Sequence, residues 1–251
     1  MEIIKAQKNI FGGLVVESSD LPSDPQEFSV RLNHSLDSWK SEGVKVVWLA
    51  ASLQQAALIP VCTEAGFTFH HAEGENLQMT CTLVPGSFIP PYATHYIGAG
   101  GVVLRDDGKL LVVSERYKQM PGRRLKLPGG ALQTGEHIGT AVVREVKEET
   151  GIDAKFDHMV CLRHWHNYRY GKSDIYFVCR LTPLSVEIHM DSRELVECLW
   201  IPLEEYLSDS DVHSFNKLAV RAATESKSGL AMNIISEYKP DTYEVLVNPG
   251  S

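Results

Sequence analysis

Residues 126–152 read KLPGGALQTGEHIGTAVVREVKEETGI, a glycine-rich loop followed by a segment that carries three carboxylates within five residues. On a helix of about 3.6 residues per turn, these carboxylates share one face because Glu148 and Glu149 follow Glu145 by three and four positions. A second stripe, about a quarter of a circle away, consists of Gly139, Val142, Val143 and Val146. The pattern predicts a helix that packs on one side and presents an acidic face on the other.

The chemistry of this acidic face favours a bound cation. Clustered glutamate oxygens suit a hard ion such as Mg2+ or Mn2+, which bridges protein carboxylates to substrate phosphates. Such an ion lowers the pKa of a bound water, so that hydroxide can attack phosphorus near neutral pH. Gly129 and Gly130 let the backbone approach the ion, and a main-chain carbonyl there could be a further ligand. The alternative is a solvated acidic face with helical pairs such as Arg144 with Glu148.

The same residues fit the pattern G-x5-E-x7-R-E-U-x-E-E-x-G-U, where U is aliphatic, without a mismatch. The chain therefore resembles the Nudix hydrolases, enzymes that cleave nucleoside diphosphates linked to another moiety. The resemblance implies that Glu145 and Glu149 are metal ligands, with Glu148 a third ligand or a base, and Gly130 is the candidate carbonyl ligand. It also implies a structural pair between Arg144 and Glu136. The matching positions are Gly130, Glu136, Arg144, Glu145, Val146, Glu148, Glu149, Gly151 and Ile152.

Composition narrows the class of partner and the compartment. A formal charge of -8 over 251 residues argues against a nucleic-acid backbone as the main partner, and the family resemblance implies a small nucleotide substrate instead. No apolar run approaches the roughly 20 residues that span a bilayer, and no presequence is predicted, so we expect a cytoplasmic protein. The odd number of cysteines, without a C-x2-C pair, indicates buried thiols in a reducing compartment. They are Cys62, Cys81, Cys161, Cys179 and Cys198.

The chain is long enough for two domains, and we expect a boundary near residue 92, in the proline-rich segment VPGSFIPPYATH. Residues 1–92 alternate strand and helix signals and predict a small α/β domain. Its firmest element is a helix over residues 24–42, with Asp24 as N-cap and Pro25 in the first turn; a second is predicted over residues 52–65. His70 and His71 are adjacent in a predicted strand and should face opposite sides, within an aromatic-rich structural corner.

Three further segments narrow the resemblance: GFTFHHAEGENLQM, PPYATHYIGAGGVVL and HNYRYGKSDIYFVCRL. They are similar to the Nudix subgroup that includes the fibroblast-growth-factor antisense protein and plant ADP-ribose/NADH pyrophosphatases. This resemblance implies an acetyltransferase-like α/β N-terminal domain before a Nudix α/β/α sandwich over residues 93–251, and it favours ADP-ribose or NADH as substrate. The chain lacks the SQPWPFPxS motif of dedicated NADH-cleaving enzymes, and Asn167 replaces the proline of many ADP-ribose enzymes. Nucleotide sugars, dinucleoside polyphosphates, coenzyme A derivatives, capped RNA and inositol pyrophosphates stay open.

The C-terminal domain offers several candidate substrate contacts. Residues 97–105 and 109–116 flank the turn signal DDG and predict a hairpin in the sheet beneath the Nudix helix. Residues 155–164 and 173–181 predict two more strands, joined by an aromatic loop that suits a nucleobase and phosphate or is a solvent-facing tip. Two arginines before the Nudix loop are either a solvated pair or phosphate ligands. The candidate substrate-binding residues are Arg123, Arg124, His164, His166, Tyr168 and Lys172.

Two features follow the second strand pair. Glu194 stands six residues before Trp200, where many Nudix enzymes carry another carboxylate, so it is a candidate metal ligand or base, or an exposed loop residue. Residues 211–226 predict an amphipathic helix, and the tail beyond is an extended segment or an interface strand. Other classes of function are a regulatory module that binds a nucleoside diphosphate without turnover and, more weakly, an N-terminal acyltransferase. Homodimer formation through the N-terminal domain is a further hypothesis.

Overall fold

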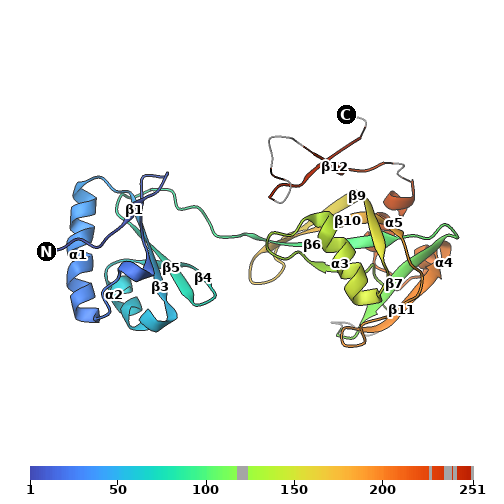
Figure 1. Cartoon of the computed structure of the whole chain (residues 1–251), viewed down its shortest axis with the longest axis horizontal. Helices are drawn as coiled ribbons and strands as arrows, with labels where there is room; N and C mark the ends of the chain where they lie inside the picture. Colours follow the sequence, from blue (N-terminus) through green and yellow to red (C-terminus); the bar gives the residue numbers. More distant parts are fainter. Residues whose placement is uncertain (118–123, 226–227, 235–238, 240–241, 250–251) are drawn as a thin grey trace. The chain divides into compact units, whose positions relative to one another are not determined.

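The computed structural model describes residues 1–117, 124–225, 228–234, 239 and 242–249. The chain divides into two compact units, Met1–Ala93 and Thr94–Ser251, which are described separately (Figure 1). In the part of the chain that the structure describes, no helix has the length and apolar character needed to span a membrane.

The N-terminal unit is a five-stranded sheet with helices, and its strand order is β1-β2-β3-β5-β4. Strands β2 and β3 are parallel, and the other neighbours are antiparallel. The strands are β1 (Gln7–Lys8), β2 (Leu14–Val16), β3 (Val46–Ser52), β4 (Thr68–Glu73) and β5 (Asn76–Thr82). The helical elements are η1 (Ser18–Asp20), α1 (Pro25–Ser41), η2 (Leu53–Leu58) and α2 (Ile59–Glu64).

Helix α1 confirms the predicted helix with its predicted start. The Asp24 side chain accepts a hydrogen bond from the Glu27 N–H at 2.8 Å, and Pro25 opens the first turn, where no N–H is needed. The second predicted helix is divided into η2 and α2: Gln55 has non-helical angles within η2, and Pro60, which cannot donate a backbone hydrogen bond, lies in the first turn of α2. The buried face of α1 consists of Phe28, Leu32, Ser35, Leu36 and Trp39.

The prediction that His70 and His71 face opposite sides of their strand is wrong. The β4–β5 pairing shifts register between Phe69 and His71, and this bulge turns both imidazoles together, with their Nδ1 atoms 2.6 Å apart. Tyr92 stacks on His71 with ring centroids 4.1 Å apart, and Trp48 meets His70 at 4.7 Å. The expected aromatic-rich corner is therefore confirmed.

The C-terminal unit contains a four-stranded sheet of order β8-β6-β10-β9 and a two-stranded sheet of β7 and β11. Strands β6 and β10 are parallel, and the other pairs are antiparallel. The strands are β6 (His95–Val103), β7 (Lys109–Glu115), β8 (Gly129–Ala131), β9 (Ala154–Trp165), β10 (Ser173–Pro183), β11 (Leu195–Pro202), β12 (Ala231–Asn233) and β13 (Val245–Val247). The helices are α3 (Ile138–Thr150), α4 (Leu203–Ser208) and α5 (Ser214–Glu225).

Helices cover both faces of the four-stranded sheet, as Figure 1 shows for α3 and α5. On one face, Val142 and Val146 of α3 pack in a core cluster with Ala99 of β6. On the other face, Val220 of α5 packs in a cluster with Val102 of the same strand. These layers confirm the predicted α/β/α sandwich.

The predicted hairpin of β6 and β7 is wrong in its pairing. A single bridge, Leu104 with Leu110, and one hydrogen bond from the Arg105 N–H to the Lys109 carbonyl at 2.9 Å join the strands beside their turn. Beyond that point β6 pairs with β10 over residues 95–103 on one edge and with β8 over residues 98–100 on the other, and its pairing with β7 does not continue. Strand β7 pairs with β11 instead.

Candidate active site

Helix α3 ends at Gly151, a glycine whose backbone adopts the left-handed conformation. Gly151 has a φ of +75°, and its N–H donates to the Lys147 carbonyl at 2.9 Å. A Cβ atom at Gly151 would lie 2.6 Å from the Cβ of His189, so the close approach as well as the backbone angle requires glycine. The helix therefore ends two residues after Glu149, the last of the three carboxylates.

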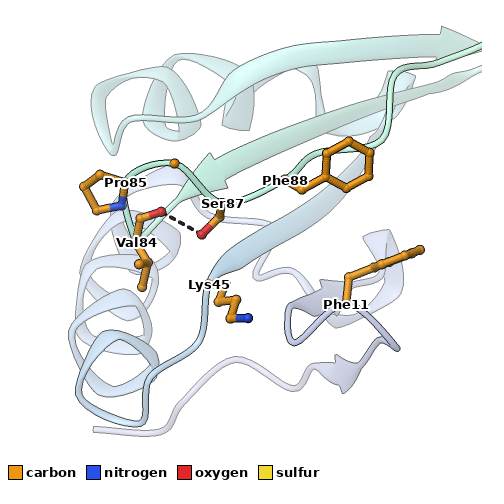
Figure 2. Close-up of a pocket in the computed structure, with 7 residues that line it drawn as sticks. Phe11, Lys45, Val84, Pro85, Ser87 and Phe88 are labelled. Atoms are coloured by element: carbon orange, nitrogen blue, oxygen red, sulfur yellow. Dashed lines mark hydrogen bonds between the residues drawn. The ribbon is translucent and has the colours of Figure 1, made fainter.

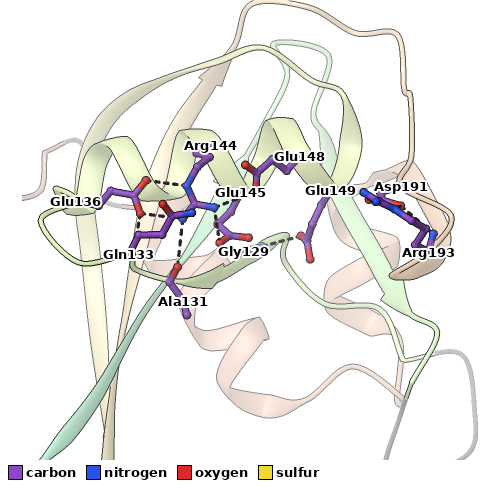
Figure 3. A network of polar contacts seen from close by, with 10 residues as sticks. All are labelled: Gly129, Ala131, Gln133, Glu136, Arg144, Glu145, Glu148, Glu149, Asp191 and Arg193. Carbon is purple, nitrogen blue, oxygen red and sulfur yellow. Dashed lines mark hydrogen bonds and ion pairs between the residues drawn. The ribbon is translucent and has the colours of Figure 1, made fainter. Parts of the chain in front are cut away.

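The Arg144 side chain connects the loop before α3 to the helix's acidic face (Figure 3). Its guanidinium donates to both carboxylate oxygens of Glu136, at 2.7 and 2.8 Å. The same group donates to Glu145 at 2.8 Å and to Glu148 at 2.9 Å. The hydrogen bonds from Arg144 are the main cause that lowers the pKa of Glu136. Three carboxylates are thus held around one guanidinium, which braces the loop against the helix.

Glu149 lies apart from this cluster and is buried, with 6% of its surface exposed. Its carboxylate accepts a hydrogen bond from the Gly129 N–H at 2.8 Å. Burial raises the pKa of Glu149 to about 7, and the charges of Glu145 and Glu115 add to the rise, although Lys126 and the Gly129 N–H oppose it. The negative charge of the buried Glu149 carboxylate is therefore only partly compensated by the neighbouring protein groups.

Gly130 forms the other wall of the site. A Cβ atom at this position would lie 2.5 Å from the Oε2 atom of Glu145, so a larger residue at position 130 would force the Glu145 carboxylate to move. The two glycines at the start of β8, which we call the diglycine segment, thus face two carboxylates, Glu149 at Gly129 and Glu145 at Gly130. The potential metal ligands in this arrangement are therefore backbone and carboxylate oxygens.

This donor set fits Mg2+ or Mn2+, because both ions prefer oxygen ligands and a buried, undercompensated carboxylate is stabilised by a cation. Among the described residues, no three His, Cys, Asp or Glu side chains stand close enough together to hold a metal ion in their present positions. In this arrangement the Arg144 guanidinium engages Glu148 as well as Glu145. Glu145 and Glu149 are the pair that would hold the ion, with a carbonyl from the diglycine segment.

Two residues beside Glu149 were missed by the sequence analysis. Lys126 contacts the Glu115 carboxylate, and these two groups shift the pKa of Glu149 in opposite directions. Lys126 is the first residue of the stretch 126–152, but no pattern in the neighbouring sequence predicts that its side chain points toward Glu149. Glu115 is on β7, and its approach depends on the bridge between Val113 and Lys126, a long-range pairing that no local pattern reveals.

Glu194 lies in the exposed loop before β11, where its carbonyl accepts a hydrogen bond from the Arg116 N–H at 2.7 Å. Glu194 is exposed, whereas Glu149 is buried. In the same loop, Arg193 pairs with Asp191 at 2.6 Å (Figure 3). This loop is joined to the end of α3, because the Asp191 N–H donates a hydrogen bond to the Glu149 carbonyl at 3.0 Å, and the role of Glu194 stays a prediction.

The predicted substrate contacts are divided between the two faces of the sheet. His164 meets His95, with their Nε2 atoms 3.0 Å apart, and His166 meets His164 with ring centroids at 4.3 Å. Tyr168 instead packs with Trp165 at a centroid distance of 5.1 Å. Because His164 and Trp165 are consecutive in β9, their side chains point to opposite faces.

Of the three remaining candidate contacts, the structure describes two. Arg124 is exposed beside the Nudix loop, and Lys172 closes the tip of the aromatic loop through a hydrogen bond from its N–H to the Arg169 carbonyl at 2.9 Å. Arg123 lies outside the described residues.

An arginine surrounded by aromatic rings was not anticipated. The Arg163 guanidinium lies 5.3 Å from the ring centroids of Trp165 and Tyr176 and 5.2 Å from that of Phe215. It also pairs with the buried Asp174 at 2.8 Å. Residues from β9, β10 and α5 meet here, so the group depends on strand register and helix docking that the sequence pattern does not specify.

The N-terminal unit contains a hollow of 340 Å³ around Lys45 (Figure 2). Exposed Phe11 and Phe88 flank it, and the Ser87 hydroxyl donates a hydrogen bond to the Val84 carbonyl at 2.7 Å. Of the described residues that line the hollow, only Lys45 is charged. The lining therefore offers a substrate no acid–base pair, and the candidate active site is the one on α3.

Two family models match the chain: one described as Nudix hydrolase domain covers residues 4–83, and one described as NUDIX domain covers residues 94–222. The chain therefore belongs to the Nudix hydrolase family, and the predicted resemblance is confirmed. The N-terminal match is also to a Nudix hydrolase domain, so the likeness of this unit to acetyltransferases stays a prediction.

Curated relatives agree with this assignment. The chain is similar to Nudix hydrolase 8 from Arabidopsis thaliana, with 38% identity over 82% of the chain and 56% of the relative. It is similar to Nudix hydrolase 2 from the same plant, with 36% identity over 86% of the chain and 78% of the relative. Nucleoside diphosphate-linked moiety X motif 6 from Xenopus laevis is 39% identical over 76% of the chain and 97% of the relative. The chain thus spans little more than half the length of the first of these relatives.

Proposed function

We propose that this Nudix hydrolase cleaves the pyrophosphate bond of a nucleoside diphosphate derivative in the presence of Mg2+ or Mn2+. The observation that carries the proposal is the buried Glu149 carboxylate, which lies with Glu145 at the diglycine segment of β8. A carboxylate whose pKa is raised by burial, beside a second carboxylate, is a group that a divalent cation would stabilise. Water attack on one phosphorus would release two phosphate monoesters.

The residues have distinct roles in this proposal. Glu145, Glu149 and the Gly130 carbonyl would hold the ion, and Arg144 keeps the Glu145 carboxylate oriented through its 2.8 Å hydrogen bond. The bound ion supplies Lewis-acid polarisation of a phosphoryl oxygen and a water of lowered pKa. Glu148, whose side chain is 59% exposed, is a third ligand or takes the proton of the attacking water.

Glu194 is the other candidate for the role of base. It would have to enter from the exposed loop before β11, whereas Glu148 already lies on the acidic face of α3. Single glutamine variants of the two residues separate these roles. The variant that lacks the base should lose turnover and retain its affinity for Mn2+, which calorimetry measures without substrate.

For the substrate we favour ADP-ribose or NADH. The resemblance to plant ADP-ribose/NADH pyrophosphatases supports this choice, and so does the group of Arg163, Trp165 and Tyr176, which offers rings and a guanidinium to a base and phosphates. The net charge of -8 makes capped RNA and inositol pyrophosphates less attractive substrates. A panel of nucleoside diphosphate derivatives, assayed with Mg2+ and with Mn2+, tests the choice.

The panel should compare the native protein with Glu149→Gln, and Glu204→Gln on α4 is a control that loses the same charge at an exposed position. We expect one substrate to be cleaved by the native protein and the control and to be spared by Glu149→Gln. Equal cleavage by all three proteins would overturn the role of Glu149.

One observation favours a second candidate function, a module that binds a nucleoside diphosphate without turnover. Arg144 holds both Glu145 and Glu148, and the three α3 carboxylates do not converge as they stand. Nucleotide binding by the native protein, with no phosphate monoester released from any member of the panel, would support this candidate.

We also propose a cytoplasmic location and a homodimer that forms through the N-terminal unit. The five cysteines are free, and burial raises the pKa of every one of their thiols, which supports a reducing compartment. Light scattering of the full chain and of residues 94–251 tests the dimer. A dimer formed by residues 94–251 alone would contradict the assigned surface.

A further inference from the structure

Helix α3 begins without a cap of its own. The residue before it, His137, has extended backbone angles but makes no side-chain capping hydrogen bond. The first N–H groups of a helix have no acceptor within the helix, and Ser, Thr, Asp or Asn at the preceding position usually provides one. The helix that carries the acidic face therefore needs an acceptor from elsewhere in the chain.

Glu244 provides that acceptor from more than a hundred residues away. Its Oε2 atom accepts a hydrogen bond from the Ile138 N–H at 2.8 Å, and its Oε1 atom accepts one from the Gly139 N–H at 3.2 Å. Both carboxylate oxygens are used on two successive N–H groups. The negative charge also lies at the positive end of the helix dipole, which strengthens the contact.

Packing fixes the position of Glu244. It belongs to a segment that we call the C-terminal strap, the described residues 229–234 and 242–248, in which β12 and β13 pair antiparallel. Leu230 and Met159 of β9 exchange two backbone hydrogen bonds, of 2.9 and 3.0 Å. Leu230 and Leu246 also pack against the α3-side core. The strap is thus attached to the same face of the sheet as helix α3.

The C-terminal strap supports the start of helix α3 from outside the region that the family model matches. The NUDIX family model ends at residue 222, before the strap begins. Within the matched region, Arg144 braces the loop through Glu136, and Gly151 ends the helix. Those contacts hold the middle and the end of α3. Among the contacts of the described residues, Glu244 alone holds the first two N–H groups of this helix.

The start of α3 and its acidic face are parts of one rigid element. At a rise of about 1.5 Å per residue, Glu145 and Glu149 lie roughly 10 and 16 Å along the helix from Ile138. A shift or fraying of the first turn therefore changes where the acidic face meets the diglycine segment of β8.

We infer that Glu244 is a positioning residue for helix α3, and that the C-terminal strap thereby sets the affinity of the α3 carboxylates for their cation. The inference rests on the proposed function for the role of that cation. Glu244 contacts the first turn of α3, whereas Glu145 and Glu149 are on its later turns, so its effect passes through the helix.

The test compares the full native chain with Glu244→Gln and Glu244→Asp. The control is Glu204→Gln, which removes one exposed glutamate charge at the start of another helix, α4. Hydrogen exchange of the Ile138 and Gly139 amides reports the cap directly. We expect exchange about fivefold faster in Glu244→Gln, a factor typical of a lost cap, with partial rescue in Glu244→Asp and no change in the control.

Calorimetric titration with Mn2+ alone, without substrate, reports the positioning. We expect Mn2+ affinity to fall by about threefold to tenfold in Glu244→Gln, and saturating Mn2+ should restore most of kcat. Unchanged amide exchange and unchanged Mn2+ affinity in Glu244→Gln would overturn the inference. If Glu244→Gln does not fold, Glu244→Asp provides the same comparison.

The two proposals fail in different ways. If the native protein binds Mn2+ and cleaves no substrate, the proposed function fails, while the exchange and titration data still decide the role of Glu244. If the native protein cleaves its substrate and Glu244→Gln behaves as the native protein in all three measurements, the strap inference alone fails.

Discussion

Replacing Glu149 by glutamine should stabilise the metal-free protein at neutral and higher pH, although it should abolish metal-dependent turnover. The folded protein buries this carboxylate, and burial raises its pKa from 4.5 to about 7. Glutamine keeps a carbonyl that can accept the 2.8 Å hydrogen bond from the Gly129 N–H, and it has no charge to bury.

The size and direction of the effect follow from the difference in pKa. Because the folded pKa of Glu149 exceeds the unfolded one, the folded state binds the proton more tightly, and this contribution to stability is complete below about pH 4.5. The contribution is lost as the pH rises through about 7. At about 1.36 kcal/mol per pKa unit, the difference between native protein and Glu149→Gln approaches about 3 kcal/mol at about pH 8.

Urea unfolding in EDTA, at about pH 5 and about pH 8, measures this difference. Glu148→Gln is the matched control, because it removes a charge from the same face at a side chain that is 59% exposed. We expect Glu149→Gln to gain stability over the native protein at the higher pH, and much less at the lower one. A gain of equal size at both pH values would refute the assignment of the effect to the Glu149 charge.

Three further substitutions test the parts around the acidic face. Arg144→Met should lower stability by about 1–3 kcal/mol and reduce turnover, because it leaves Glu136 and Glu145 without their shared partner; urea unfolding and kcat/KM measure both losses. Gly130→Ala should reduce kcat/KM by about a hundredfold with little change in Tm, because the added Cβ displaces the Glu145 carboxylate; an unaffected kcat/KM would contradict the tight fit. Gly151→Ala should lower the free energy of unfolding by about 1–3 kcal/mol, since it strains a φ of +75°, and a Tm equal to that of the native protein would show that the helix end adapts.

Local patterns in the sequence predicted the elements whose causes are local. The N-cap at Asp24 and Pro25 determine the start of α1, and the spacing of the apolar and acidic residues determines the two faces of α3. The α/β/α sandwich of the C-terminal unit was predicted from the family resemblance, and the apolar stripes of α3 and α5 agree with it, since each packs on a sheet face. The family resemblance supplied the order of the layers.

Features that depend on long-range pairing could not be predicted. The bulge that brings His70 and His71 together is a property of the β4–β5 ladder, and neither residue signals it. The separation of β6 from β7 depends on the distant partners that each strand takes, β10 and β8 for β6 and β11 for β7. The Glu244 cap joins residues more than a hundred positions apart, so no local pattern near Ile138 indicates it.

The central claim is that the α3 carboxylates and the diglycine segment of β8 form a metal-dependent pyrophosphatase site. The most direct measurement is the release of phosphate monoesters from ADP-ribose and NADH in 18O-labelled water, with Mn2+ or with EDTA, by the native protein and by Glu145→Gln and Glu149→Gln. We predict that the native protein places one 18O in one of the two products, only with the metal, and that each variant loses at least about a hundredfold in rate. Turnover that persists in EDTA, or in both variants, would contradict the account.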